Sequence, residues 1–225
     1  MKSQLFFSFN NQTNLSKSDI VVGEFNKPIV DFLFVLDNWL SNVLYVYGDA
    51  GVGKTFISHI FIKENQGAAV SFADISSLEN IEKITNKHKL ILLEDIGSKS
   101  LDDEVNIFNL YNTVLANGSK LILTARESIQ DIAIQLPDLR SRLNAAMIFK
   151  INTPDEISLK AIFFKMLSDK QLNVSMEVMD YFLKRIHRDC YTLGRLVEKI
   201  EDWTMREKKT LNLSTAKNID IADLV

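Results

Sequence analysis

The residues best suited to chemistry form the glycine-rich segment GDAGVGKT at positions 48–55. The pattern G-x-x-x-x-G-K-[ST] curls backbone N–H groups around phosphate oxygens, and its glycines leave room because they have no Cβ. Lys54 is expected to reach the β- and γ-phosphates, and Thr55 to ligate Mg²⁺. An apolar run at 43–47 predicts a buried strand before the loop, and the segment 56–62 predicts a helix whose N-terminus faces the phosphates. The sequence therefore predicts nucleotide binding.

Two carboxylates, Glu94 and Asp95, directly follow the apolar run Leu90–Leu93. Acids at a strand end beside a lysine-bearing loop hold Mg²⁺ and orient the attacking water. Here the longer acid, Glu94, takes the metal-side position and the shorter acid, Asp95, takes the water-side position. A carboxylate displaced by about 1 Å costs on the order of a hundredfold in rate. We therefore expect intact nucleotide binding with weak intrinsic hydrolysis, and the alternative for this pair is a solvated strand end.

Two arginines, Arg140 and Arg142, precede the last predicted strand near the rim of the sheet. A guanidinium keeps its charge and contacts two phosphate oxygens at once, so a finger that completes a neighbour's site is worth about 10³ to 10⁵ in rate. Of the two, Arg140 is expected to be the surface residue. Taken alone, the pair is better explained as two solvated basic side chains.

The composition limits the class of protein. The 225 residues are 46% hydrophobic and 24% charged, which suits one α/β domain plus a smaller appendage. The single cysteine, Cys190, fits a reducing cytosol, and we find no apolar run long enough to span a membrane. The net charge of −3, from 26 basic and 29 acidic residues, gives no basic field for nucleic acid. We expect a soluble, cytoplasmic protein that meets DNA only indirectly, through another protein.

Short apolar runs separated by helix-length segments continue after the glycine-rich loop. Strands that alternate with helices predict a parallel sheet covered on both faces. From Thr153 the pattern becomes helical, and Thr153, Pro154 and Glu156 are interpreted as N-cap, first and third positions of a capping box. The predicted strands lie at 43–47, 68–72, 90–93, 121–124 and 146–149. Two amphipathic stripes are assigned to the core of the helical part: Val178, Met179, Phe182, Leu183 and Ile186, and Leu193, Leu196, Val197, Ile200 and Trp203.

These segments together resemble the AAA+ proteins of bacterial replication initiation, the family of DnaA and its shortened relative Hda. Ile20–Asn26 looks like the V-x-G-x-x-N box that flanks the adenine, and Leu121–Arg126 is similar to the sensor-1 strand, with Thr124 as its polar residue. Leu136–Leu143 resembles the arginine-finger segment and places the finger on Arg142. Cys190–Leu196 covers the sensor-2 region, where Tyr191 holds the usual arginine position and Arg195 follows one turn later.

The resemblance implies a P-loop AAA+ module at 13–152, with a parallel sheet sandwiched by helices, and a small helical lid at 153–225. It assigns ATP or ADP with Mg²⁺ as cofactors, Thr55 and Glu94 to the metal, and Glu94, Asp95 and Arg142 to catalysis. The nucleotide contacts that it implies are Val22, Asn26, Gly48, Asp49, Ala50, Gly51, Val52, Gly53, Lys54, Thr55, Phe56, Thr124 and Arg195.

The first residues, 1–12, look like the short clamp-binding peptide of Hda proteins, with Gln4, Leu5, Phe7 and Phe9 as its contacts. Aromatic anchors at an unconstrained terminus give a partner pocket something to bury. The alternative is an N-terminal strand that packs on the body of the protein. The resemblance thus implies a negative regulator of replication initiation. It would bind the DNA sliding clamp, the beta subunit of DNA polymerase III, and stimulate hydrolysis of ATP bound to a DnaA-like initiator, preventing over-initiation.

Two other functions remain open at this point. A helicase-loader-like AAA+ ATPase would hydrolyse its own ATP and grip single-stranded DNA in a basic, aromatic groove. A P-loop kinase would transfer phosphate to a small metabolite and has no need for the arginine segment. The sequence leaves undecided whether ADP or ATP is the working ligand and whether the protein is a monomer or a homodimer.

Overall fold

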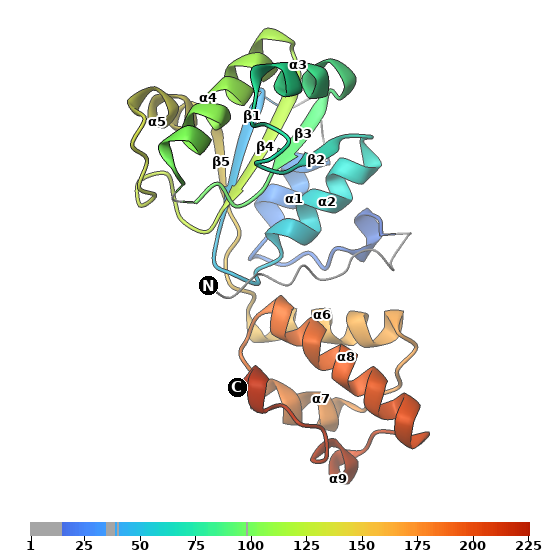
Figure 1. Ribbon diagram of the computed structural model, residues 1–225. Helices are drawn as coiled ribbons and strands as arrows, with labels where there is room; N and C mark the ends of the chain where they lie inside the picture. The colour runs from blue at the N-terminus through green and yellow to red at the C-terminus, as the bar shows by residue number, and fades with distance from the viewer. Residues whose placement is uncertain (1–14, 35–38, 40, 98) are drawn as a thin grey trace.

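The computed structural model describes residues 15–34, 39, 41–97 and 99–225, and the predicted clamp-binding residues lie outside these ranges. Five parallel strands form one sheet in the order β2-β3-β4-β1-β5. They are β1 (Val43–Tyr47), β2 (Ala68–Val70), β3 (Leu90–Leu93), β4 (Lys120–Ala125) and β5 (Met147–Lys150). The predicted α/β class with a parallel sheet is confirmed (Figure 1).

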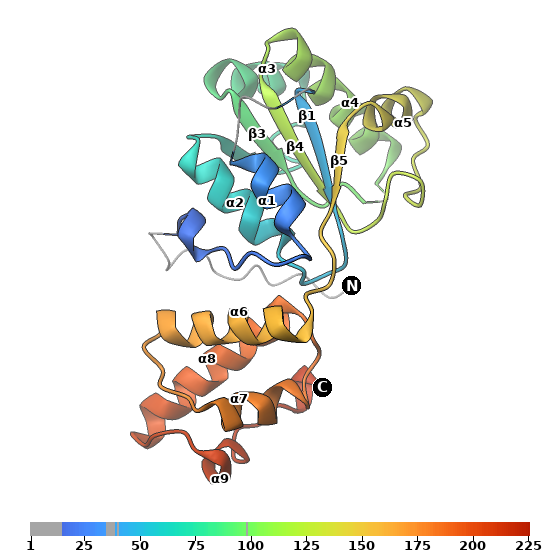
Figure 2. The ribbon, with the colours of Figure 1, turned by 180° about the vertical axis from the view of Figure 1, so that it is seen from behind.

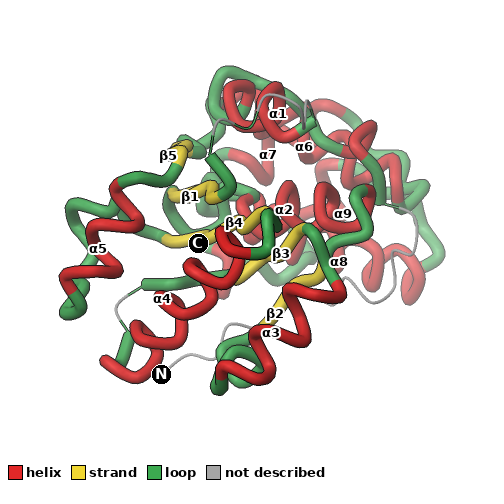
Figure 3. The backbone as a smooth tube through the Cα atoms, turned by 90° about the horizontal axis from the view of Figure 1, so that it is seen from above, coloured by secondary structure: helices red, strands yellow, loops and turns green. Residues whose placement is uncertain are grey.

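Helices cover both faces of the sheet because successive strand residues point to opposite sides. In β1, Leu44 and Val46 pack into one hydrophobic cluster, and Val43 and Tyr45 pack into the other. The first cluster is covered by α1 (Lys27–Leu33) and α2 (Lys54–Glu64), which lie in front of the sheet in Figure 2. The second is covered by α3 (Leu78–Lys87), α4 (Leu101–Ala116) and α5 (Pro137–Asn144). Viewed from above, α3, α4 and α5 line one side of the sheet (Figure 3).

In residues 151–225, all of which the structure describes, only helical elements follow the last strand. They include α6 (Glu156–Asp169), α7 (Met176–Leu183), α8 (Cys190–Glu207) and the short α9 (Leu213–Ala216). We call residues 153–225 the helical bundle and residues 15–152 the sheet unit. The two predicted stripes pack inside the bundle, where Met179, Phe182, Leu193 and Leu196 are fully buried. The predicted capping box is wrong, since the N-cap of α6 is Asp155, whose side chain accepts from the Ser158 N–H at 2.8 Å.

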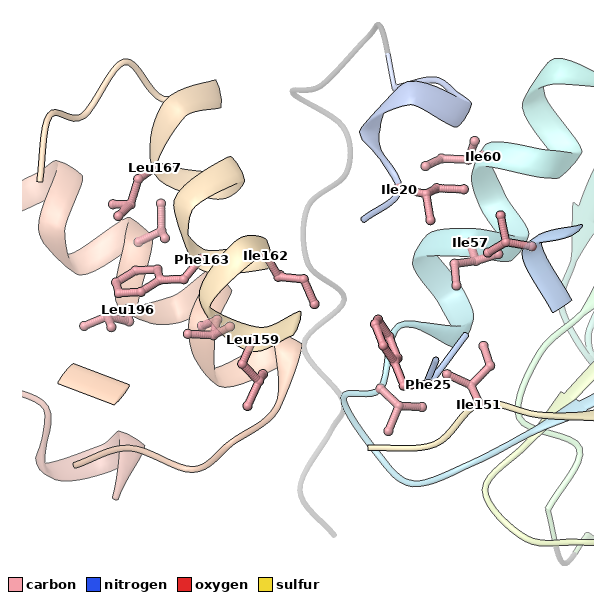
Figure 4. Close-up of a cluster of buried hydrophobic side chains, with 14 of the residues drawn as sticks. Ile20, Phe25, Ile57, Ile60, Ile151, Leu159, Ile162, Phe163, Leu167 and Leu196 are labelled. Atoms are coloured by element: carbon pink, nitrogen blue, oxygen red, sulfur yellow. The ribbon is translucent and has the colours of Figure 1, made fainter. Parts of the chain in front are cut away.

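The bundle packs against the sheet unit through α6. Ile20, Phe25 and Ile151 of the sheet unit belong to the same hydrophobic cluster as Leu159 and Ile162 of α6. In Figure 4, Ile162 points toward the sheet unit, whereas Phe163 and Leu167 point toward Leu196 of α8. A mainly hydrophobic contact therefore fixes α6 beside the segment that precedes α1.

An ion pair supports this junction at one side. Lys165 Nζ on α6 lies 2.9 Å from Asp19 Oδ1, at the end of a single 3₁₀ turn (Lys17–Asp19). Burial alone would raise the pKa of Asp19, but hydrogen bonds from Lys165 and from the Ser16 N–H outweigh it and lower that pKa. Asp19 is therefore ionised at neutral pH and links the two parts of the chain.

No helix in the described ranges combines the length and the apolar character that crossing a bilayer requires.

Candidate nucleotide-binding site

The candidate site lies where the carboxyl ends of three neighbouring strands meet. In a parallel sheet these ends share one edge, and the pairs Val46–Thr124 and Leu93–Leu123 bring β1, β3 and β4 into register there. The glycine-rich loop leaves β1, the two acids leave β3, and Thr124 lies near the end of β4. The sheet thus gathers three segments that are separated by dozens of residues in the sequence.

The glycine-rich loop is shaped for an anion. Gly51 and Gly53 adopt φ values of +78° and +100°, which residues with a Cβ rarely take. A Cβ added at Gly53 would meet no atom within 4 Å, so the space beside that backbone is open. Lys54 opens α2, and its Nζ donates to the carbonyl oxygens of Gly48 and Asp49 at 2.6 and 2.8 Å. The loop therefore holds its own lysine next to an open cradle at a helix N-terminus.

Charges around the loop act on the lysine. Burial lowers the pKa of Lys54, and the nearby Arg126 guanidinium lowers it further, while Asp95, Asp49 and Glu94 act in the opposite direction. Lys54 and Arg126 are therefore close enough for each cation to disfavour the charge of the other. A bound polyphosphate would relieve this repulsion.

Glu94 follows β3 and faces α2. Its Oε2 lies 2.9 Å from Nε2 of His59, and its side chain is 21% exposed. Burial alone would raise the pKa of Glu94, but hydrogen bonds from His59 and Thr55, together with the charges of His59 and Lys54, lower it. Its other oxygen, Oε1, is buried and has no hydrogen-bond partner among the described residues. Glu94 is therefore an ionised carboxylate with one oxygen that makes no hydrogen bond within the described residues.

Asp95 is held differently. Its φ of +53° is unusual for a non-glycine residue. Its backbone N–H donates to the Thr124 hydroxyl at 3.1 Å, and Arg126 Nε lies 3.8 Å from its Oδ1. Thr124, the predicted sensor residue, is 2% exposed, and this hydrogen bond fixes the backbone of Asp95. The carboxylate predicted to orient water thus lies close to a cation.

The N-terminus of α8 lies directly on the glycine-rich loop. The Cys190 N–H donates to the Gly51 carbonyl at 2.9 Å. A Cβ built on Gly51 would come within 2.4 Å of Asp189 Oδ1 and 2.9 Å of Asp189 Cβ. Asp189 is the N-cap of α8 and accepts from both the N–H and the hydroxyl of Thr192. Gly51 is thus required by its own φ and by the close approach of the bundle.

The predicted adenine box forms a tight loop before α1. Asn26 is 2% exposed; its Oδ1 accepts from the Gly23 N–H at 2.9 Å and its Nδ2 donates to the Val21 carbonyl at 3.0 Å. Val22 is exposed at the outside of this loop. Within the glycine-rich loop, Asp49 and Ala50 are exposed, Gly48 and Val52 are buried, and Phe56 packs against the core.

The predicted sensor-2 candidates lie on α8. Tyr191, at the usual arginine position, is partly exposed. The guanidinium of Arg195 lies 2.5 Å from Asp223 Oδ2, and Lys199 pairs with the other oxygen of Asp223. The structure therefore ties Arg195 to the C-terminal turn (Ala222–Leu224) of the bundle.

The arginine segment forms α5, and the two arginines differ from the expectation. Arg140 is half-buried, and its guanidinium donates to the carbonyls of Ile129, Ile132 and Ile134. Arg142 is exposed, with its guanidinium carbon 6.0 Å from the centre of the Tyr111 ring. The prediction that Arg140 is the surface residue is wrong, because Arg140 secures the loop before α5 while Arg142 is directed outward.

Glu104 on α4 holds the start of α5 and was not singled out from the sequence. It is 2% exposed, and its carboxylate accepts from the Gln135 and Leu136 N–H groups at 2.7 to 3.0 Å. His59 and Arg126 were also missed. The position of His59, one helical turn after Thr55 on α2, was the only sequence signal that could have found it.

The residues present fit a magnesium-bound nucleotide. The open cradle at Gly53 and the cations Lys54 and Arg126 are complementary to phosphates. Oε1 of Glu94, which is buried without a hydrogen-bond partner in the described part of the chain, suits a hard divalent cation. Thr55 lies close enough to Glu94 to lower its pKa, so the two predicted metal ligands are neighbours.

Sequence comparison finds one matching protein family and several related proteins. The sequence model of the family described as Novel STAND NTPase 3 matches residues 37–169. An uncharacterised protein of Haemophilus influenzae is 29% identical over 189 residues, which cover 78% of this chain and 80% of that protein. The chromosomal replication initiator protein DnaA of Buchnera aphidicola subsp. Cinara cedri is 27% identical over 198 residues. That match covers 79% of this chain but only 45% of the Buchnera protein.

Solved structures share the fold. Domain III of DnaA from Thermotoga maritima superposes with a TM-score of 0.81 at 19% identity, covering 93% of this chain and 96% of that domain. DnaA of Aquifex aeolicus, solved with AMPPCP bound, gives a TM-score of 0.70 at 20% identity and covers 86% of this chain and 68% of its own. The fold of the chain is therefore the AAA+ fold of DnaA domain III.

Proposed function

Because the chain belongs to the Novel STAND NTPase 3 family, we propose that it is an adenine-nucleotide-binding AAA+ protein that regulates a DnaA-like initiator. It binds ADP or ATP with Mg²⁺ at 48–55, and it stimulates hydrolysis of ATP on the partner through Arg142. Support comes from the AAA+ fold, the similarity to a DnaA protein, and the AMPPCP bound by the Aquifex relative. The cation, when bound, would neutralise phosphate charge beside Thr55 and Glu94.

The observation that carries the proposal is the contrast between the two arginines of α5. Arg140 is occupied by three backbone carbonyls, whereas Arg142, two residues later, is exposed. A guanidinium that acts on another molecule's phosphate must be exposed on a well-held element. Arg140 binds carbonyls along the loop that leads into α5, and Glu104 binds the last N–H groups of that loop, so the helix that carries Arg142 is anchored.

The two acids support slow hydrolysis by the chain itself. Glu94 is engaged by His59 and Thr55, and Asp95 faces Arg126. A carboxylate drawn about 1 Å out of position by a neighbouring cation loses on the order of a hundredfold in rate as a group that positions water. The nucleotide would then serve to order the protein, and the rate acceleration would occur on the partner.

Phosphate release from ATP-loaded DnaA, in the presence of sliding clamp and DNA, tests the proposal. The parent protein is expected to raise the rate, and Arg142→Ala to remove most of that effect. Arg206→Ala is a matched control, since Arg206 is an exposed arginine at the far end of α8. Stimulation by Arg142→Ala equal to that of the parent would refute the role of Arg142.

Nucleotide binding is tested separately by titration with fluorescent ADP. Lys54→Ala is expected to abolish binding, because it removes the cation that the loop holds at Gly48 and Asp49. Undiminished affinity would show that the glycine-rich loop is not the binding site.

Clamp attachment through Gln4, Leu5, Phe7 and Phe9 is part of the same proposal and rests on the sequence alone. A pull-down with purified sliding clamp should retain the parent protein and lose both Gln4→Ala and Leu5→Ala. Equal retention of all three proteins would remove the clamp from the proposal and leave the nucleotide site untouched.

A further inference from the structure

His59 lies beside the candidate site, and the proposal so far uses it only as a partner of Glu94. It is on α2, four residues after Thr55, so both side chains lie on the same face of the helix and both reach Glu94. Nε2 of His59 lies 2.9 Å from Oε2 of Glu94, and the imidazole is 37% exposed. Since an ionised carboxylate only accepts hydrogen bonds, Nε2 carries the proton in this contact.

The two oxygens of Glu94 therefore have different surroundings. Oε2 is satisfied by His59, whereas Oε1 is buried without a hydrogen-bond partner among the residues that the structure describes. A buried carboxylate oxygen left in this state is unfavourable unless a ligand completes it. A hard divalent cation is the ligand whose chemistry suits such an oxygen next to a threonine hydroxyl.

Resting on the proposed function, we infer that His59 is a positioning residue for the magnesium site. By donating to Oε2 it holds the carboxylate in one orientation and reserves Oε1 for the cation. Partners that hold metal-binding side chains in this way typically change metal affinity by 10- to 100-fold when they are removed. His59 contacts neither phosphate nor metal in this role and acts only through Glu94.

The alternative is that the pair between His59 and Glu94 only stabilises the packing of α2 against β3. A purely structural contact would affect thermal stability and would weaken nucleotide binding equally with and without the cation. A positioning role would affect the part of the affinity that depends on Mg²⁺. The ratio of the two dissociation constants therefore separates the two explanations.

The experiment is a fluorescent-ADP titration at one fixed pH, in excess EDTA and in saturating Mg²⁺. For His59→Leu we expect affinity in EDTA within about twofold of the parent, and a Mg²⁺-dependent gain reduced about tenfold or more. His59→Gln retains an N–H donor and should recover most of the gain. His187→Leu is the control, since His187 is exposed and precedes α8.

Each result has one meaning. A parent protein that binds no fluorescent ADP in either buffer overturns the nucleotide proposal itself. A parent that binds ADP without any gain from Mg²⁺, or a His59→Leu protein with the parental gain, overturns the role of His59 alone. Should His59→Leu fail to fold, His59→Asn, whose amide is too short to reach Glu94, gives the same comparison, and a parental gain there overturns the inference.

Discussion

The buried carboxylate of Glu104 gives a sharp test of how α5 is held. Glu104 lies on α4 and accepts from two backbone N–H groups, Gln135 and Leu136, immediately before the first residue of α5. It is 2% exposed, so water does not replace these bonds easily. The contact also places a negative charge at the N-terminus of α5, where the helix dipole favours it. Replacing Glu104 should therefore loosen the helix that carries Arg142.

The magnitude follows from the bonds. Two charge-assisted hydrogen bonds at about 1.5 kcal/mol each, with about 0.5 kcal/mol from the helix dipole, give a cost of about 3.5 kcal/mol for Glu104→Ala. In Glu104→Gln the bonds become neutral and about half as strong, and the amide turns a donor toward one N–H, so about 1.5 kcal/mol is lost. For a chain of this size, the loss of about 1.5 kcal/mol in Glu104→Gln lowers the melting temperature by about 3–6 °C.

Thermal unfolding of the sheet unit is the assay. The chain has two tryptophans, so Trp203→Phe leaves Trp39 as the fluorescence reporter in the sheet unit. Asp102→Asn is the control, because it removes the same charge from an exposed position on the same helix. A Glu104→Gln protein that melts within about 1 °C of this control would refute the reasoning. The same variant should stimulate a DnaA-like partner severalfold less while binding fluorescent ADP normally.

Three further results are expected where the helical bundle meets the sheet unit. Gly51→Ala should melt at a lower temperature than Gly53→Ala. Both substitutions strain the backbone, but only the Cβ at position 51 meets the N-cap of α8. Equal melting temperatures for the two variants would contradict that contact. Burial raises the pKa of Cys190 to about 12. Iodoacetamide at pH 8 should therefore label Cys190 in the native protein about a thousandfold more slowly than in the urea-unfolded protein. Rapid labelling of the native protein would show that the bundle opens freely. Lys165→Met should lower stability at pH 7, where Asp19 is ionised. Because the pKa of Asp19 is lowered in the fold, this contribution is complete above the unfolded value of 3.8 and is lost as the pH falls through the folded value. The melting difference between parent and variant should therefore shrink on acidification below pH 3.8, and a constant difference would argue against the pair.

Local patterns in the sequence determined the strands, the glycine-rich loop and the helical character of the last third. Each of these depends on residues close together in the chain: buried parallel strands are continuous apolar runs, and a phosphate loop needs glycines and a lysine at fixed spacing. The start of α6 shows the limit of such reasoning. Thr153, Pro154 and Glu156 satisfy a capping pattern, but the structure uses Asp155, while the Thr153 hydroxyl contacts Asp49 in the glycine-rich loop.

The tertiary structure decided which polar groups meet. The local sequence did not show which of Arg140 and Arg142 is exposed, because that depends on carbonyls from the preceding loop and on a ring from α4. Likewise, the pair of His59 with Glu94 joins residues 35 positions apart, and it exists only because β3 packs beside α2. The energy of such contacts depends on distance, burial and orientation, which are set once the whole chain has packed. The sequence alone therefore predicts a nucleotide loop, and the packing decides which charges remain available to act.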